Sequence, residues 1–243
     1  MKMGKRWKKE EGKAKIRAYV ATPAYQGKVD TDYAVSLAES CQYATAAGIH
    51  VTAAVMGNGA FIDLARCNFA HMFLQGDYTH LFFIDADLRW EARAFLGLLT
   101  SGRELCAGVY RRRQEPEDYP VRYIEDDRGG LQIEDGGWIK CDRVPTGFMC
   151  IERKVIEEMS KGARKLMQRD MDPVAQLFYT QVLENGAYMG EDYSFCEDYV
   201  KQFNKPIWVW PDFDFTHGGY KCNWHDFILK QVQEQDLIEV ANG

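Results

Sequence analysis

The sequence predicts one α/β domain with a mostly parallel central sheet, followed by an antiparallel and irregular C-terminal half. Between residues 16 and 113, apolar strand candidates alternate with segments of helical periodicity. This alternation is typical of parallel strands joined by right-handed helical crossovers. After residue 113, polar and apolar residues alternate around Gly-Gly pairs, as they do in an antiparallel meander.

The elements of the first half follow from short apolar runs and helical spacing. Strands are expected at residues 16–22, 49–55, 80–85 and 104–110, and helices at 31–47, 61–74 and 91–100. A loop at 23–28 and a turn at 57–59 connect them. The first helix should carry Ala34, Leu37, Ala38 and Cys41 on one face, with Gly48 as its stop.

The second half is expected to begin with the antiparallel meander, at about residues 121–145. Its remaining elements are helices at 153–168 and 192–203, a short strand at 206–211, a loop at 212–221 and a terminal helix at 224–240. A turn at 145–147 should lead into a core strand. No repeat or linker interrupts the chain, so we expect a single domain at 16–243 behind a basic N-terminal tail at 1–15.

Composition excludes several classes of protein. A hydrophobic content of 46% supports a core, and the net charge of −6 does not indicate a nucleic-acid surface. The seven cysteines form no C-x-x-C pair, so we expect core thiols rather than disulfides or zinc ligands. With no apolar run of membrane-spanning length and no signal segment, we expect a soluble, cytoplasmic protein.

Two carboxylates end the most apolar strand candidate, in the stretch "THLFFIDADLRW". In open α/β sheets ligands bind at the carboxyl ends of the strands. Asp85 and Asp87 are two residues apart, so in an extended chain they face the same side and are suited to Mg²⁺ or Mn²⁺. Asp-x-Asp alone is a weak signal, because it recurs at 30–32, where helix capping explains it, and in the loop at 212–214.

The order of several blocks resembles the GT-A glycosyltransferases, in particular small family-2-like enzymes encoded by bacteriophages and large DNA viruses. The blocks are "YVATPAY", "ARCN", "GDYTHLFFIDADL", "AGVYRRR", "VPTGFMCIERKVIEEM", "GEDYSFCEDYV" and "FTHGGY", within residues 16–221. The resemblance implies a Rossmann-like nucleotide-diphospho-sugar transferase fold. It further implies a nucleotide-binding half at 16–113 and an acceptor-binding half at 114–243.

The resemblance implies a donor site for a nucleotide-diphosphate sugar, with a UDP-sugar favoured. Base and ribose would lie against Thr22, Pro23 and Tyr25, and the diphosphate would face Arg66. Asp85, Ala86 and Asp87 would border the diphosphate, and Asp85, Asp87 and His217 would hold Mn²⁺ or Mg²⁺. Gly218 would let the backbone approach a phosphate, and Lys221 would add charge there or remain a solvated lysine.

The resemblance also implies a catalytic base and an acceptor side. Asp192, favoured over Glu191, would deprotonate the acceptor hydroxyl as inverting transfer requires, although helix-dipole stabilisation also explains both acids. Gly147 would line the donor sugar or the acceptor. Trp208, Trp210 and Tyr220 would stack on a sugar or belong to the core.

Other readings remain open at this level. A nucleotidyltransferase uses similar acids but would be expected to carry a Gly-rich basic loop after the first strand, where "TPAYQGK" has one glycine and one lysine. A non-catalytic carbohydrate-binding or viral structural protein is the third alternative. The acceptor is unidentified, with a hydroxylated DNA base, a protein and a glycan as the candidates.

Overall fold

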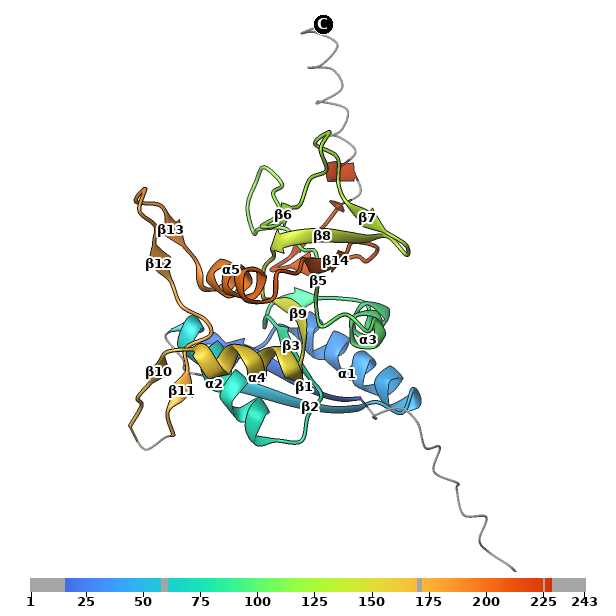
Figure 1. Ribbon diagram of the computed structural model, residues 1–243. Coiled ribbons are helices and arrows are strands. Elements are labelled where there is room, and N and C mark those ends of the chain that lie inside the picture. The colour runs from blue at the N-terminus through green and yellow to red at the C-terminus, as the bar shows by residue number, and fades with distance from the viewer. Residues whose placement is uncertain (1–15, 58–60, 170–171, 225, 229–243) are drawn as a thin grey trace, which may run out of the picture.

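The computed structural model describes residues 16–57, 61–169, 172–224 and 226–228. The predicted N-terminal tail, part of the turn at 57–59 and most of the predicted C-terminal helix lie outside these residues. Figure 1 shows a central sheet with helices on both faces. No helix of the described residues is both long enough and apolar enough to span a membrane.

The central sheet has nine strands in the order β2-β1-β3-β9-β5-β14-β8-β6, with β7 also paired to β8. They are β1 (Arg17–Ala24), β2 (His50–Gly57), β3 (His80–Ile84), β5 (Leu105–Gly108), β6 (Arg122–Tyr123), β7 (Ile133–Glu134), β8 (Trp138–Arg143), β9 (Phe148–Glu152) and β14 (Ile207–Trp210). Strands β1, β2, β3, β5 and β14 share one direction, whereas β8 and β9 oppose them. The predicted α/β class and mostly parallel sheet are confirmed.

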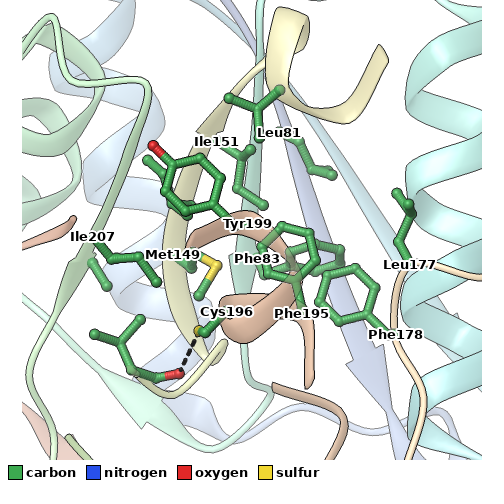
Figure 2. Packing of buried hydrophobic residues seen from close by; sticks show 14 of the residues in the cluster. Leu81, Phe83, Met149, Ile151, Leu177, Phe178, Phe195, Cys196, Tyr199 and Ile207 are labelled. Carbon is green, nitrogen blue, oxygen red and sulfur yellow. Dashed lines mark hydrogen bonds between the residues drawn. The ribbon is translucent and has the colours of Figure 1, made fainter. Parts of the chain in front are cut away.

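Alternation along the strands builds a core on each face of the sheet. On β3, Phe83 belongs to one buried cluster and Phe82 to the other. Helices α2 (Ile62–Gln75), α4 (Arg153–Gly162) and α5 (Glu191–Phe203) cover the face with Phe83, where Phe178 and Phe195 stack with ring centroids 4.5 Å apart (Figure 2). Helices α1 (Thr31–Ala46) and α3 (Ala92–Thr100) cover the other face.

The prediction that Ala34, Leu37, Ala38 and Cys41 form the buried face of α1 is wrong. The buried residues are Tyr33, Ser36, Ser40 and Ala44. Two serines lie inside because the Trp90 backbone N–H donates to Ser36 Oγ at 3.2 Å and the indole N–H donates to Ser40 Oγ at 2.9 Å. Buried N–H groups require acceptors, and this need outweighs the apolar pattern.

Several boundaries also differ from the prediction. Strand β1 continues through Pro23, because its register with β2 extends to Ala24 and Gly57. The helix predicted at 153–168 ends at Gly162, and β10 (Lys165–Leu166) then pairs with β11 (Val174–Ala175). A hairpin of β12 (Gln181–Val182) and β13 (Tyr188–Met189) precedes α5.

The loop predicted at 212–221 contains two strands. Strand β15 (Thr216–His217) pairs with β16 (Tyr220–Lys221) and with β4 (Leu88–Arg89), which directly follows the Asp85–Asp87 acids. This small three-stranded sheet joins residues 216–221 to the segment that follows β3. The seven cysteines are all free, five of them buried and two half-buried, so the prediction of thiols without disulfides is confirmed.

Candidate functional site

A cleft of about 550 Å³ opens where β1 and β3 end. These strands are parallel neighbours, so their carboxyl ends meet at one edge of the sheet. Residues predicted from the sequence to contact the donor line it together, namely Pro23, Tyr25, Arg66, Asp85, Ala86 and Asp87. The remaining lining residues include Lys28, Asp30 and Arg113.

Asp85 is held by backbone and by a glycine. Its N–H donates to the Gly147 carbonyl at 2.9 Å, and the Gly147 N–H donates to the Tyr110 hydroxyl at 2.9 Å. A Cβ at Gly147 would collide with the Asp85 carboxylate and the Tyr110 hydroxyl. The close approach at Gly147 is therefore to Asp85, which lines the cleft, and to the buried Tyr110.

Arg66 connects two acids that are far apart in the sequence. Its guanidinium donates to Asp85 at 3.1 Å and to Glu191, and the residue is only 4% exposed. Burial lowers the pKa of Arg66, but the two carboxylates outweigh that effect and raise it above its ordinary value. Arg66 therefore remains a buried cation, and its charge is shared between Asp85 and Glu191.

Asp87 has two basic neighbours. Arg113 donates to its Oδ2 at 2.8 Å, and His217 Nε2 lies 3.5 Å from its Oδ1. Burial raises the pKa of Asp87, but His217 and Arg113 more than offset this and hold it below its ordinary value. The strand pairing of His217 with Leu88 creates this contact, and the Gly218 N–H fixes it by donating to the Asp87 carbonyl at 2.9 Å.

The orientation of His217 bears on the expected metal. His217 Nδ1 lies 2.7 Å from the Arg111 carbonyl, which can only accept, so Nδ1 carries the proton. Burial lowers the pKa of His217, but Asp87 and the Arg111 carbonyl outweigh that effect and raise it. In its neutral form the imidazole would direct its Nε2 lone pair at Asp87 Oδ1, and a cation between these two atoms would satisfy both. Within the described ranges, no three His, Cys, Asp or Glu side chains gather closely enough to hold a metal. Asp87 and His217 thus face each other, and Asp85 is turned to Arg66.

Glu191 and Asp192 begin α5 directly after Gly190. The Glu191 carboxylate is paired with Arg66, whereas Asp192 Oδ1 accepts only the Tyr193 N–H, at 2.8 Å, and has no ion pair within the described residues. Burial and the neighbouring Glu191 raise the pKa of Asp192 despite the opposing effect of Arg66. One acid is therefore neutralised by a cation, and the other has a strengthened affinity for a proton.

Other predicted residues lie outside the cleft. Thr22 is fully buried and shares a hydrogen bond with the Tyr33 hydroxyl, so its side chain does not face a ligand. Lys221 lines a separate cavity of about 850 Å³ bordered by α1, α3 and the three-stranded sheet. Trp208 lies under the Arg103 guanidinium at 3.7 Å, and Trp210 stacks on Trp138 at 5.3 Å. These two tryptophans belong to a packed cluster.

Two further predicted residues lie close to the arginine-rich segment that follows β5. The Tyr220 ring is 37% exposed and lies 5.2 Å from the Arg111 guanidinium. Gly218 has a positive φ of 54°, and a Cβ there would meet the Arg113 side chain at 2.5 Å. Gly218 therefore lies against the Arg113 side chain, and its backbone N–H also donates to the Asp87 carbonyl.

Sequence reasoning missed Tyr110, Arg113 and Asp30. Tyr110 and Arg113 follow β5, whose direction is the same as that of β3, so they emerge at the edge that carries Asp85. Their position directly after the strand in "AGVYRRR" could have indicated from the sequence that they lie at this edge. Asp30 stands at the N-cap of α1, but its side chain makes no capping hydrogen bond and instead lines the cleft, contrary to the capping interpretation.

Comparisons with known proteins find similarity in three dimensions only. No protein-family model and no curated protein sequence matches the chain. Similar solved structures include GalNAc-T7 with UDP, GalNAc and Mn²⁺ (TM-score 0.46, 10% identity, 83% of this chain and 43% of that chain). They also include UDP-glucose pyrophosphorylase complexed with UDP-glucose (TM-score 0.47, 9% identity, 84% of this chain and 94% of that chain). A third is mannose-1-phosphate geranyltransferase from Thermus thermophilus (TM-score 0.44, 11% identity, 84% of this chain and 76% of that chain).

This chain thus spans less than half the length of the GalNAc-T7 structure. At identities of 9 to 11% and TM-scores below 0.5, none of these structures indicates which reaction the chain catalyses.

Proposed function

We propose that the chain is a metal-dependent glycosyltransferase that moves a sugar from a nucleotide-diphosphate donor, a UDP-sugar in the favoured case, to an acceptor hydroxyl. The observation that carries this proposal is the convergence of Arg66, Asp85 and Asp87 in one cleft, with Asp192 close to Arg66. A cleft with cations for a diphosphate, acids for a divalent ion and an unpaired carboxylate for a proton contains the groups that glycosyl transfer requires.

The donor would lie along the cleft with its nucleoside toward β1. Tyr25 is 72% exposed at the cleft and presents a ring on which a base or ribose can stack. Arg113 and Lys28 bring positive charge to the same cleft. A guanidinium facing a diphosphate forms charge-assisted hydrogen bonds and stabilises the leaving nucleoside diphosphate.

Asp87 and His217 would hold Mn²⁺ or Mg²⁺, with Asp85 beside them and phosphate and water oxygens completing the coordination. When bound, the ion neutralises negative charge that develops on the leaving diphosphate. The Asp85 carboxylate, fixed by Gly147 and Arg66, would keep this part of the cleft rigid.

Asp192 would act as the general base of an inverting transfer. It has no cation of its own within the described residues, and its pKa is raised by burial and by Glu191, so a proton from an acceptor hydroxyl is accepted more readily. Glu191 is neutralised by Arg66 and would serve to position that arginine.

A binding and hydrolysis experiment tests this proposal. Thermal unfolding with Mn²⁺ and each nucleoside diphosphate should reveal stabilisation by at least one, about 2.7 kcal/mol at a hundredfold excess over Kd. The corresponding sugar nucleotide should be slowly hydrolysed. Asp87→Ala should abolish the Mn²⁺-dependent part, whereas Asp77→Ala, a surface change at a carboxylate paired with Arg17, should retain it.

Absence of both stabilisation and hydrolysis would refute the glycosyltransferase. Retained Mn²⁺ dependence in Asp87→Ala would refute the metal site alone. The nucleotidyltransferase alternative draws support from Lys28, a basic residue that follows the first strand and lines the cleft. It predicts pyrophosphate release from a nucleoside triphosphate and a sugar phosphate, and this product separates the two activities.

A further inference from the structure

Arg143 ends β8 next to the first turn of α5. Cys141, two residues before it, belongs to the core cluster beneath α5, and an irregularity in the pairing of β8 with β6 lies between Cys141 and Arg143. Its guanidinium lies 5.7 Å from the Tyr193 ring centroid, and Tyr193 directly follows Asp192. The half-buried Arg143 thus lies against the residue that directly follows the proposed base.

Apart from the Tyr193 ring, the charge of this arginine has no partner among the described residues. Arg112, Arg113 and Arg122 pair with Asp118, Asp87 and Asp142 at 2.7, 2.8 and 2.5 Å. Among the residues that the structure describes, the Arg143 side chain forms neither an ion pair nor a hydrogen bond, and its buried Nε–H has no acceptor. A buried N–H without an acceptor costs free energy, and a half-buried cation costs more.

A second polar group on the same segment is also unsatisfied. The Thr146 hydroxyl is buried without a hydrogen-bond partner, and Thr146 itself is 1% exposed. The next residue, Gly147, packs against Tyr110 and against Asp85, which lines the cleft. Two unsatisfied polar groups, on Arg143 and Thr146, therefore lie on the segment that leads to Gly147 and Asp85.

We propose that Arg143 recognises the acceptor by binding an oxyanion on it, a phosphate or a carboxylate. This inference rests on the proposed function, because it assigns Asp192 to the acceptor hydroxyl. A guanidinium binds either oxyanion through two parallel hydrogen bonds, which fixes orientation as well as distance. Anchored there, the acceptor would present its hydroxyl to the carboxylate of Asp192, and Arg143 would be a positioning and specificity residue.

Titration calorimetry with three sugar probes tests the inference. Glucose 6-phosphate, glucuronate and methyl glucoside are titrated into the protein saturated with UDP and Mg²⁺. At least one anionic probe should bind more tightly than methyl glucoside, and the two anions separate phosphate from carboxylate recognition. Arg143→Gln should weaken that binding roughly tenfold or more, and Arg143→Lys should restore part of it. Arg122→Gln, a nearby exposed arginine, is the matched control and should change nothing.

A nitrogen NMR signal gives a readout that a merely structural role would not affect. The Arg143 Nε–H resonance, assigned by its loss in Arg143→Gln, should shift to saturation with the anion that binds. Equal affinity of wild type and Arg143→Gln for both anions, undetectable binding by both included, would overturn the inference. UDP binding is measured first, and its absence would refute the proposed function without bearing on Arg143. In that case the same probes are titrated into the protein without UDP, and the affinities of wild type and Arg143→Gln for the anions are compared there.

Discussion

At the scale of single residues, Glu191 and Asp192 show how one contact separates the roles of two neighbouring acids. Both stand at the start of α5, where the helix dipole favours negative charge equally. Arg66 reaches Glu191 and leaves Asp192 without an ion pair in the described chain. The two carboxylates should therefore respond differently to removal of their charge.

Asp192→Asn should lower the rate of sugar transfer roughly 10²- to 10⁴-fold, because the general base is lost, while donor affinity remains unchanged. Glu191→Gln should instead lower the free energy of unfolding by about 1–3 kcal/mol, because the buried Arg66 loses a charged partner. Transfer kinetics and urea unfolding of both variants measure this. A stable Asp192→Asn enzyme with full activity would contradict the assignment of the base.

At the scale of elements, α1 is attached to the sheet through polar contacts of Trp90. The indole N–H donates to Ser40 Oγ inside the protein, so Ser40→Ala should leave it unsatisfied and reduce stability by about 1–3 kcal/mol. Thr45→Ala, which removes an exposed hydroxyl of the same helix, is the control. Equal unfolding midpoints for the two variants in urea would show that the Trp90 contact contributes nothing.

Glu104 connects the chain before β5 with α4 and α5. It contacts Lys154, Lys205 and the Tyr199 hydroxyl. Burial raises the pKa of Glu104, but these partners outweigh it and lower the pKa below its ordinary value of 4.5. The folded state thus binds a proton less readily than the unfolded state, and Glu104 stabilises the fold fully above that ordinary value.

The stability difference between wild type and Glu104→Gln should therefore be constant near neutral pH. It should shrink as the pH falls from about 4.5 through the lower pKa of the folded protein. Denaturant unfolding at a series of pH values measures it, with Glu158→Gln, a half-exposed carboxylate that pairs with Lys161 on α4, as the control. A difference that grows on acidification would contradict the assigned direction.

At the scale of the whole molecule, the two halves of the chain are interleaved in one sheet. Strand β9, from the second half, lies between β3 and β5 of the first, and β14 pairs with β5. Both core clusters contain residues from both halves. Neither half can therefore bury its apolar face alone, and we expect the described fold to unfold as one unit.

Phe82→Ala and Phe83→Ala test this unity from opposite faces of β3. Each removes a fully buried ring and should cost about 3–5 kcal/mol. Both variants should keep a single transition that coincides by circular dichroism and tryptophan fluorescence. Two separated transitions, or a change confined to one probe, would contradict a single cooperative domain.

Local patterns in the sequence determined most elements and much of the cleft. The apolar run before Asp85 predicted β3, and strand order placed Pro23 and Asp87 at one edge because parallel neighbours end together. Glycines and acids before a helical pattern likewise located the start of α5. Such features depend on residues close in sequence, so they can be read without the fold.

Only the tertiary structure decided which charged groups meet. Arg66 and Glu191 are 125 residues apart, and Arg113 reaches Asp87 although nothing local pairs them. Thr22 and Lys221, expected at the donor site, face the core and another cavity, because burial and strand register determine where a side chain points. The sequence therefore determined that two acids follow β3 at one edge of the sheet, whereas long-range pairing decided which acids of the site are paired with a cation.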